Sequence, residues 1–578
     1  MQQEGGRAAE QQRRPVRVGD SGERVVGIDL GTTNSLVAVV TDGRPRVLNV
    51  DGAQLLPSVV GMDPEGVMLV GEPARNQYVA APERTVRSIK RHMGEPAYRA
   101  EMGGRTFAPE EISAFILKHL ANAASAELGE PVQRVVITVP AYFSDRQRQA
   151  TMRAGELAGL DVVRLLHEPT AAALVYGLES SGLETCLVYD LGGGTFDVSV
   201  VELGGGVTEV RASHGNRRLG GDDFDQLIVD ELVDTFQRKH HLDLRQDRAA
   251  MARLWRAAEQ AKIHLSDHAF AEIREEFLAS RNGRALHLET ELSRLRLEEM
   301  IGPLLQGTLE SVRQALRDAQ LDRRALDAVL LVGGSTRIPA VRDLVAEELG
   351  VEPRQEVHPD LAVALGAAVQ GAIASGLDVG SVLVDVCPHS LGVRALSFRA
   401  GVESDDVFVP LIRRNTAIPV SRSEVFSTMY PEQTSVLVQV YQGEEPVASR
   451  NGHLGDILFK GLSPDRQGGL REVLVAFDYD INGILHVAAV DRRNGRREEM
   501  RLHTGTMEVL DKGGLAGEAG AVLRRLQELR PHLDGEPLAQ LDALLQRADG
   551  LGATPDAEAL AAWQEQAADF LLDHAVEY

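Results

Sequence analysis

Two segments of the chain share one pattern, in which an apolar strand ends in Asp-Leu-Gly and a second apolar strand follows. They are VVGIDLGTTNSLVAVV, residues 25–40, and LVYDLGGGTFDVSVV, residues 187–201. Each predicts a strand, a tight turn and a returning strand. Glycines let backbone N–H groups converge on one point, which suits a phosphate. The carboxylates that end the first strands, Asp29 and Asp190, need a cation or a donor if they are buried.

The repetition of this pattern indicates a duplicated lobe. If the two copies face each other, their turns close on one phosphate and metal centre from two sides. A single copy is equally well explained as an ordinary hairpin with turn glycines. Two copies, each with an aspartate at the same place, favour the nucleotide interpretation.

Length and charge narrow the classes of protein that fit. A chain of 578 residues is too long for one core, so several domains are expected. A net charge of −24 argues against nucleic-acid binding. Two cysteines, Cys186 and Cys387, provide no disulfide framework, which fits a cytoplasmic location. No apolar run reaches transmembrane length, so we expect no membrane association. Residues 1–24 are polar and predict a disordered tail.

The paired hairpins resemble the ATPase domain of the heat-shock protein 70 family of molecular chaperones, of the bacterial DnaK type. The resemblance extends over residues 25–504 and is carried by many separate motifs, such as SIKR (88–91) and VLVD (382–385). It implies a multidomain α/β + β fold, with an actin-like ATPase domain of duplicated ribonuclease H-like lobes, an antiparallel β-sandwich peptide-binding domain and a short α-helical C-terminal lid. The implied limits are 25–378 for the ATPase domain, 379–386 for the linker, 387–505 for the sandwich and 506–578 for the lid.

Five residues are implied to be catalytic by this resemblance. Lys90 would contact the γ-phosphate and the attacking water, as a compact ammonium can. Glu168 and Asp197 would arrange that water, Thr195 would contact phosphate, and Asp190 would take part in metal binding. Without the resemblance, Lys90 also fits a solvated basic cluster, and Glu168 also fits an exposed acid that precedes a helix.

A larger set of residues is implied to hold the nucleotide. Part of it falls on one face of a predicted helix at 254–265, where an intrahelical ion pair is the alternative. An arginine of this set can stack flat on a purine. The implied cofactors are ATP and ADP with Mg²⁺, which Asp29 and Asp190 would hold mainly through water, and K⁺ is a further candidate ion. The implied nucleotide-binding residues are Gly31, Thr32, Thr33, Asn34, Gly192, Gly193, Gly194, Gly221, Glu259, Lys262, Ser266, Gly333, Gly334, Ser335, Arg337 and Asp360.

Other residues are implied to couple the nucleotide state to the second half of the chain. Pro140 and Arg148 would relay that state, and Arg164 would contact the linker and a J-domain partner. His167 stands where asparagine is more usual, which affects how that partner would dock. An apolar linker that docks on the ATPase domain is implied, although these residues also fit the first strand of the next domain. The linker residues concerned are Val382, Leu383, Val384 and Asp385.

Residues 387–504 show short alternating strands, which predict an antiparallel β-sandwich. By the resemblance, six residues would line a groove for an extended hydrophobic peptide, although each also fits plain sandwich core. Residues 397–406, SFRAGVESDD, predict an enlarged polar loop at the rim of this groove. After residue 506, helices are expected at 518–529, 537–548 and 556–576 and resemble a short lid. The implied peptide-binding residues are Val393, Leu396, Phe426, Met429, Val436 and Val438.

The resemblance therefore implies an ATP-dependent chaperone, an ATPase of protein folding and the stress response. Its implied partners are unfolded or hydrophobic peptide segments, a J-domain co-chaperone and a nucleotide exchange factor. Two alternatives stay open, a nucleotide-exchange or holdase helper of another chaperone and a small-molecule kinase of the actin-like superfamily. The kinase would need neither linker nor sandwich, and the implied catalytic set argues against a helper without hydrolysis.

Overall fold

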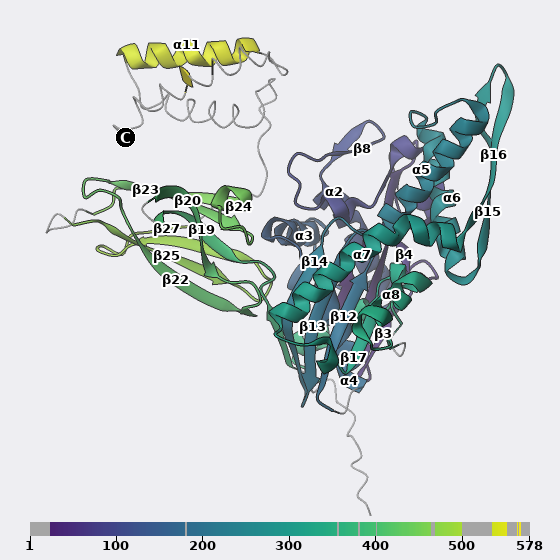
Figure 1. Ribbon diagram of the computed structural model, residues 1–578, viewed down its shortest axis with the longest axis horizontal. Coiled ribbons are helices and arrows are strands. Elements are labelled where there is room, and N and C mark those ends of the chain that lie inside the picture. Colours follow the sequence, from purple (N-terminus) through teal and green to yellow (C-terminus); the bar gives the residue numbers. More distant parts are fainter. Residues whose placement is uncertain are drawn as a thin grey trace, which may run out of the picture. The chain divides into compact units, whose positions relative to one another are not determined.

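Figure 1 shows the computed structural model of the protein. It describes residues 24–179, 182–354, 358–377, 379, 382–399, 402–463, 469–499, 535–551, 563 and 566–567. The chain divides into two compact units, Met1–Thr504 and Gly505–Tyr578. The predicted N-terminal tail lies outside the described residues, apart from Arg24.

The first lobe is built on a mixed sheet in the order β11-β10-β1-β2-β3, with β4 paired to β2. Strand β1 is parallel to β10 and antiparallel to β2. Its apolar residues are buried and pack against α2 and its neighbours in one core. The elements are β1 (Val25–Asp29), β2 (Asn34–Thr41), β3 (Arg44–Val47), β4 (Leu56–Pro57), β10 (Arg134–Val139), β11 (Asp161–His167), α2 (Pro109–Leu128) and α3 (Asp145–Leu157).

The second lobe repeats this arrangement in a sheet of order β17-β12-β13-β14, continued by β18 and β21. Strand β12 is parallel to β17 and antiparallel to β13, just as β1 is to β10 and β2. The duplication predicted from the two hairpins is therefore present in the strand topology. Helix α7 packs against β13 and β14 (Figure 1). The elements are β12 (Glu184–Leu191), β13 (Phe196–Gly204), β14 (Val207–Asn216), β17 (Ala328–Val332), α7 (Arg294–Asp318) and α8 (Pro339–Leu349).

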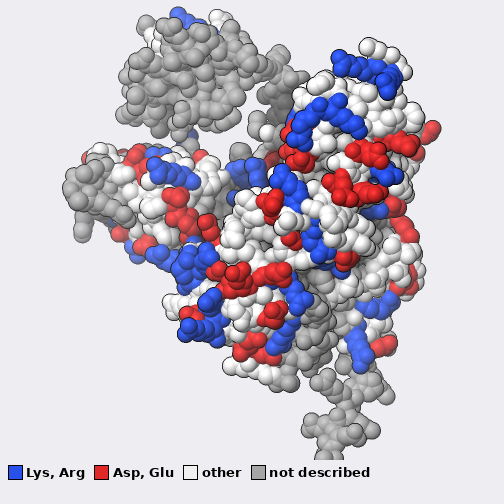
Figure 2. All heavy atoms as spheres, turned by 45° about the vertical axis from the view of Figure 1, so that its right-hand side comes forward, with Lys and Arg blue, Asp and Glu red and all other residues white. Residues whose placement is uncertain are grey.

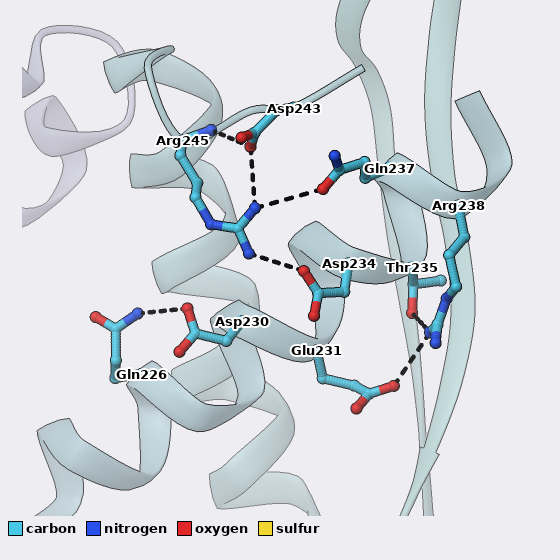
Figure 3. A network of polar contacts seen from close by, with 9 residues as sticks. All are labelled: Gln226, Asp230, Glu231, Asp234, Thr235, Gln237, Arg238, Asp243 and Arg245. Atoms are coloured by element: carbon cyan, nitrogen blue, oxygen red, sulfur yellow. Dashed lines mark hydrogen bonds and ion pairs between the residues drawn. The ribbon is translucent and has the colours of Figure 1, made fainter. Parts of the chain in front are cut away.

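Smaller elements extend each lobe. In the second lobe α5 (Gly221–His240), α6 (Arg248–Asp267) and the hairpin β15 (Phe270–Arg281) with β16 (Arg284–Ser293) share its core. Figure 3 shows the exposed side of α5, where Arg245 reaches Asp234 and Asp243 and Arg238 reaches Glu231. Such exposed ion pairs contribute little to stability. We assign no functional role to this side of α5. The first-lobe elements are α1 (Glu72–Tyr78), β5 (Val59–Met62), β6 (Met68–Val70), β7 (Thr85–Arg87), β8 (Ala100–Met102) and β9 (Arg105–Phe107).

Two helices with small residues, α4 (Glu168–Glu179) and α9 (Ala362–Ala374), cross where the lobes meet. Their backbones approach so closely that a Cβ added at Gly366 would lie 1.8 Å from the carbonyl oxygen of Ala171. A Cβ at Gly27 of β1 would lie 2.1 Å from the backbone nitrogen of Ala368. The run of alanine and glycine in α9 is therefore explained by helix packing.

Replacing Gly366 by alanine should lower the melting temperature of the protein. The added methyl group meets backbone atoms that no rotamer change can move, which typically costs about 1–3 kcal/mol or more. The matched control is Gly302→Ala on α7, where an added Cβ meets nothing within 4 Å and helix propensity predicts a gain of about 0.5–1 kcal/mol. Thermal unfolding of both variants measures the difference, and equal melting temperatures would contradict the close-packing explanation.

The C-terminal part of the first unit is the predicted β-sandwich. Its sheets have the orders β20-β19-β23-β24 and β22-β25-β26-β27 and enclose one apolar core. Between the lobes and the sandwich, β18 (Val382–Val386) pairs in parallel with β14 and antiparallel with β21. The remaining strands are β19 (Leu391–Arg399), β20 (Val402–Ile412), β21 (Ala417–Ile418), β22 (Val420–Ser427), β23 (Ser435–Gln442), β24 (Gly452–Lys460), β25 (Glu472–Tyr479), β26 (Leu485–Asp491) and β27 (Arg497–Glu499).

The prediction of an enlarged loop at 397–406 is wrong. Ser397 pairs with Ser404, Phe398 with Glu403 and Arg399 with Val402, so this segment lengthens the β19–β20 hairpin. Polar composition suggested a loop, but ladder hydrogen bonds join backbone groups and form whatever the side chains are.

The second unit contains α11 (Gly535–Leu551), which confirms the helix expected at 537–548. The indole Nε1 of Trp563 donates a hydrogen bond of 3.0 Å to the carbonyl oxygen of Leu544. The helix expected at 518–529 lies outside the described residues, as does most of the one expected at 556–576.

No helix in the described residues is long and apolar enough to cross a membrane. On the face seen in Figure 2, basic and acidic side chains are interspersed.

Candidate functional site

A cavity of about 1320 Å³ lies between the two lobes. Residues from both Asp-Leu-Gly hairpins line it, as do residues from α6, from the turn after β17 and from the start of α9. All the sequence-predicted catalytic, metal and nucleotide residues line it except Gly194 and Asp197. The two repeats thus meet at one site.

The two turns approach each other within this cavity. A Cβ added at Gly193 would lie 2.0 Å from Oγ1 of Thr33, and one at Gly220 would lie 2.5 Å from the carbonyl oxygen of Gly193. Glycine is therefore required at Gly220, where the clash is with backbone, and at Gly193 any larger residue would have to displace the Thr33 side chain. Because this leaves backbone N–H groups of the turn uncovered by side chains, the cleft can admit a phosphate.

Lys90 is buried opposite Glu168. It lies on the short 3₁₀ helix η2 (Ile89–His92), and its ammonium forms an ion pair with the carboxylate of Glu168, which begins α4. The exposed fraction of Lys90 is 5% and that of Glu168 is 7%. Lys90 does not lie in a solvated patch, and Glu168 is not an exposed acid, so both alternative interpretations are wrong.

Three buried carboxylates surround this pair. Burial and the nearby Glu168 raise the pKa of Asp29 to about 7. The same two causes raise the pKa of Asp197 to about 7 and that of Asp190 well above its usual value. Oδ2 of Asp190 is buried and has no hydrogen-bond partner among the described residues. A bound cation would give the unpaired oxygen a partner and would reduce the electrostatic repulsion between the acids.

The residues present fit a magnesium ion held mostly through water. Oxygen ligands of one or two carboxylates are what Mg²⁺ uses in nucleotide sites. In the described part of the chain, no group of three or more His, Cys, Asp or Glu side chains is placed to hold a metal. Asp29 and Asp190 line the cavity together with the phosphate turns.

The opposite end of the cavity has the polar groups expected for a nucleoside. On α6, Nζ of Lys262 lies 2.9 Å from Oδ2 of Asp225 and donates to the carbonyl oxygen of Gly221 at 3.0 Å. Oγ of Ser335 donates to the carbonyl oxygen of Gly192 at 2.9 Å. The first two bonds tie α6 to the start of α5, and the third ties the turn after β17 to the glycine turn after β12, so the two ends of the cavity are built together.

Arg337 is oriented by Asp360. Its Nη2 lies 2.6 Å from Oδ2 of Asp360, and 3.2 Å from Nε2 of His358. Arg337 keeps 49% of its side chain exposed. A guanidinium that is held flat by an acid and still open to the cavity can stack on a base.

Several supporting residues escaped the sequence analysis. Oγ1 of Thr138 donates to Oδ1 of Asp29 at 3.0 Å, and the backbone N–H of Tyr142 donates to Oδ1 of Asp197 at 2.9 Å. Arg91 pairs with Asp223 at 2.9 Å. Thr138 sits on β10, the parallel neighbour of β1, so a polar residue near the end of that strand was the available signal.

The residues predicted to couple the two halves meet in one buried network. Nη2 of Arg148 lies 2.7 Å from Nε2 of His167 and donates to the carbonyl oxygen of Ala141 at 3.0 Å. Nδ1 of His167 lies 2.8 Å from Oδ1 of Asp385. Arg164 is also buried. Pro140 directly precedes Ala141, and the network therefore joins α3, the end of β11 and the linker strand.

The linker is docked on the second lobe. Val382, Leu383 and Val384 pair with Val207, Thr208 and Glu209 of β14. The same strand continues into the sandwich through Asp385 and Val386, which pair with β21. Both sequence interpretations hold in part, since β18 pairs with β14 of the second lobe and also with β21 of the sandwich half.

The six predicted groove residues divide into two groups. Val393 and Val438 belong to the sandwich core, and Phe426 and Val436 pack against it. Leu396 is half-buried, and Met429 keeps 48% of its surface exposed. A peptide-binding role for these residues stays a prediction.

Comparison with known proteins agrees with this architecture. The family model described as Hsp70 protein matches residues 25–513. The proteins named chaperone protein DnaK from Thermotoga petrophila, Thermotoga sp. and Thermotoga maritima are each 47% identical over 486 residues, covering 83% of this chain and 80% of the relative. With the duplicated lobes, the acid-lined cavity and the sandwich in place, these matches show that the chain belongs to the Hsp70 family.

Proposed function

We propose that the chain hydrolyses ATP in the interlobe cavity and uses this reaction to control a peptide site in the sandwich. Membership of the Hsp70 family makes it an ATPase and an ATP-dependent chaperone. The observation that carries the residue assignment is the buried Lys90–Glu168 pair among three carboxylates, in the cavity that the two Asp-Leu-Gly turns line. The helper and kinase alternatives are not favoured.

The catalytic contribution of the chain is positioning and charge. Lys90 is placed to meet the developing charge on the γ-phosphate, and Glu168 and Asp197 orient the attacking water. Thr195, with Thr32 and Thr33, contacts phosphate oxygens. Mg²⁺, held by Asp29 and Asp190 through water, would neutralise phosphate charge when bound. K⁺ is a second ion that the site could take.

The nucleoside would be held by the residues at the other end of the cavity. Glu259, Lys262 and Ser266 of α6 would bind the adenine and ribose on one side, and Ser335 and Arg337 on the other. The Lys262–Asp225 bond supports this assignment because it orients the ammonium within the cavity.

The peptide would bind as an extended segment between the sandwich strands. Backbone hydrogen bonds with apolar pockets give affinity for hydrophobic segments with little sequence specificity. Docking of β18 would accompany ATP and peptide release, and nucleotide and peptide then alter each other's affinity reciprocally. A J-domain co-chaperone and a nucleotide exchange factor complete the proposed cycle, which we assign to the cytoplasm.

The test is the dissociation rate of a fluorescent hydrophobic peptide from the full chain, first with ADP and then with ATP. We expect much faster release with ATP. Val436→Ala should weaken binding, whereas Leu437→Ala should not, because successive residues of β23 face opposite sides and Leu437 is 43% exposed. Equal rates with both nucleotides would contradict the coupling, and an equal effect of the two variants would contradict the groove.

A further inference from the structure

A histidine stands at the centre of the network that joins the linker to the catalytic glutamate. His167 ends β11, and the next residue, Glu168, begins α4 and carries the catalytic carboxylate. The exposed fraction is 2% for His167, 3% for Asp385 and 0% for Arg148. The imidazole therefore contacts the linker on one side and α3 on the other, with no room for water between the bonded atoms at 2.7–2.8 Å.

The hydrogen-bond donors determine the protonation state of this imidazole. A guanidinium can only donate, so Nε2 of His167 must accept from Nη2 of Arg148. Nδ1 must then carry the single proton and donate it to Oδ1 of Asp385. A second proton, on Nε2, would place an N–H of His167 against an N–H of Arg148, with the two nitrogens only 2.7 Å apart. It would also face an arginine whose Nε and Nη1 have no acceptor of their own among the described residues.

Charged side chains from three elements, β18, α3 and β11, surround His167. Asp385 of β18 favours the imidazolium, whereas Arg148 of α3 and Arg164 of β11 disfavour it. Burial is the largest effect and lowers the pKa of His167 below its usual value. Burial also opposes ionisation of Asp385, but the facing histidine and the Val386 N–H outweigh it and lower the pKa of that carboxyl. The docked junction thus fits a carboxylate and a neutral imidazole.

We propose that His167 is a positioning residue that ties the docked linker to Glu168, and that it does so only as a neutral imidazole. Linker docking then becomes sensitive to protons, since docking requires His167 to lose any proton gained in the undocked state. Above a pH of about 6.5, the usual histidine pKa, docking is unaffected. Below it, protonation of His167 weakens docking by up to about tenfold per pH unit. The inference rests on the proposed role of linker docking.

Amide hydrogen exchange of residues 382–386 measures docking directly. The full chain is held with a slowly hydrolysed ATP analogue at pH 7.5 and 5.5, with rates corrected for intrinsic exchange. We expect protection to fall about tenfold in the unmodified chain. It should not fall in His167→Asn, whose amide can accept from Arg148 and donate to Asp385 but cannot be protonated.

The control is His119→Asn, a partly exposed histidine on α2 that pairs with Asp51 and lies outside the junction. It should keep the full pH dependence. His167→Ala should lose protection and hydrolysis rate at pH 7.5, where His167→Asn keeps both. The proposal is overturned if His167→Asn retains the full pH dependence, or if His167→Ala behaves as the unmodified chain. An unprotected linker at pH 7.5 in the unmodified chain would instead contradict the docking role itself.

Discussion

Lys90→Ala should reduce the rate of ATP hydrolysis by about 10²–10³-fold while nucleotide binding is kept. The ammonium of Lys90 is the cation paired with Glu168 among three buried acids. An alanine there leaves the developing phosphate charge without this partner, whereas Lys262 and Arg337, to which we assign nucleoside binding, are unchanged. Single-turnover hydrolysis measures the rate, and a fluorescent nucleotide measures the binding.

Arg91→Ala is the matched control for this prediction. Arg91 follows Lys90 in the same basic run, but its guanidinium pairs with Asp223 and it does not line the nucleotide cavity. We expect less than about a tenfold loss, as for a residue outside the reacting centre. Comparable losses in both variants would show that the basic run acts as a whole and that Lys90 has no special role.

Asp385→Ala should abolish the acceleration of peptide release by ATP. The carboxylate is 3% exposed and is bonded to His167 and to the Val386 N–H. Removing one partner of a buried, hydrogen-bonded charged contact costs about 2–5 kcal/mol. A loss of this size lowers the equilibrium constant for linker docking by about 30-fold or more. Stopped-flow release of a labelled peptide, with and without ATP, measures the effect.

The control lies at the other end of the same strand. Val382 keeps 61% of its surface exposed and joins β14 through its backbone. Val382→Ala should therefore release peptide at nearly the rate of the unmodified chain. If the two variants release peptide alike, the apolar character of the linker and not its carboxylate would explain docking.

The features that could be predicted from the sequence are those that depend on residues close together in the chain. The two Asp-Leu-Gly hairpins predicted the duplicated topology, and the cavity gathers the nucleotide residues that the family resemblance implied. Glycine suits this turn because a Cβ at Gly193 would meet the side chain of Thr33 in the facing hairpin. Here the residue type follows from the close approach of the two hairpins, so the pattern could be interpreted correctly.

The parts that were missed depend on partners distant in sequence. Thr138 supports Asp29 only because β10 lies beside β1, and Asp225 meets Lys262 across two helices. The hairpin extension at 397–406 was missed because its pairing depends on backbone register and its polar side chains carry no strand periodicity. His167 was noticed as an unusual residue, but its role required the positions of Arg148 and Asp385.

The parallel pairing of β18 with β14 has a consequence for solubility. While the linker is docked, the outer N–H and C=O groups of Val207, Thr208 and Glu209 are covered. Once it leaves, β14 becomes an open sheet edge, the kind of surface on which other chains add strands and aggregate. Glu209 and Arg211 lie on this strand, and Arg211 forms ion pairs with Glu209 and with Glu202 of the neighbouring strand β13. Charges of this kind would protect the edge that the proposed cycle exposes.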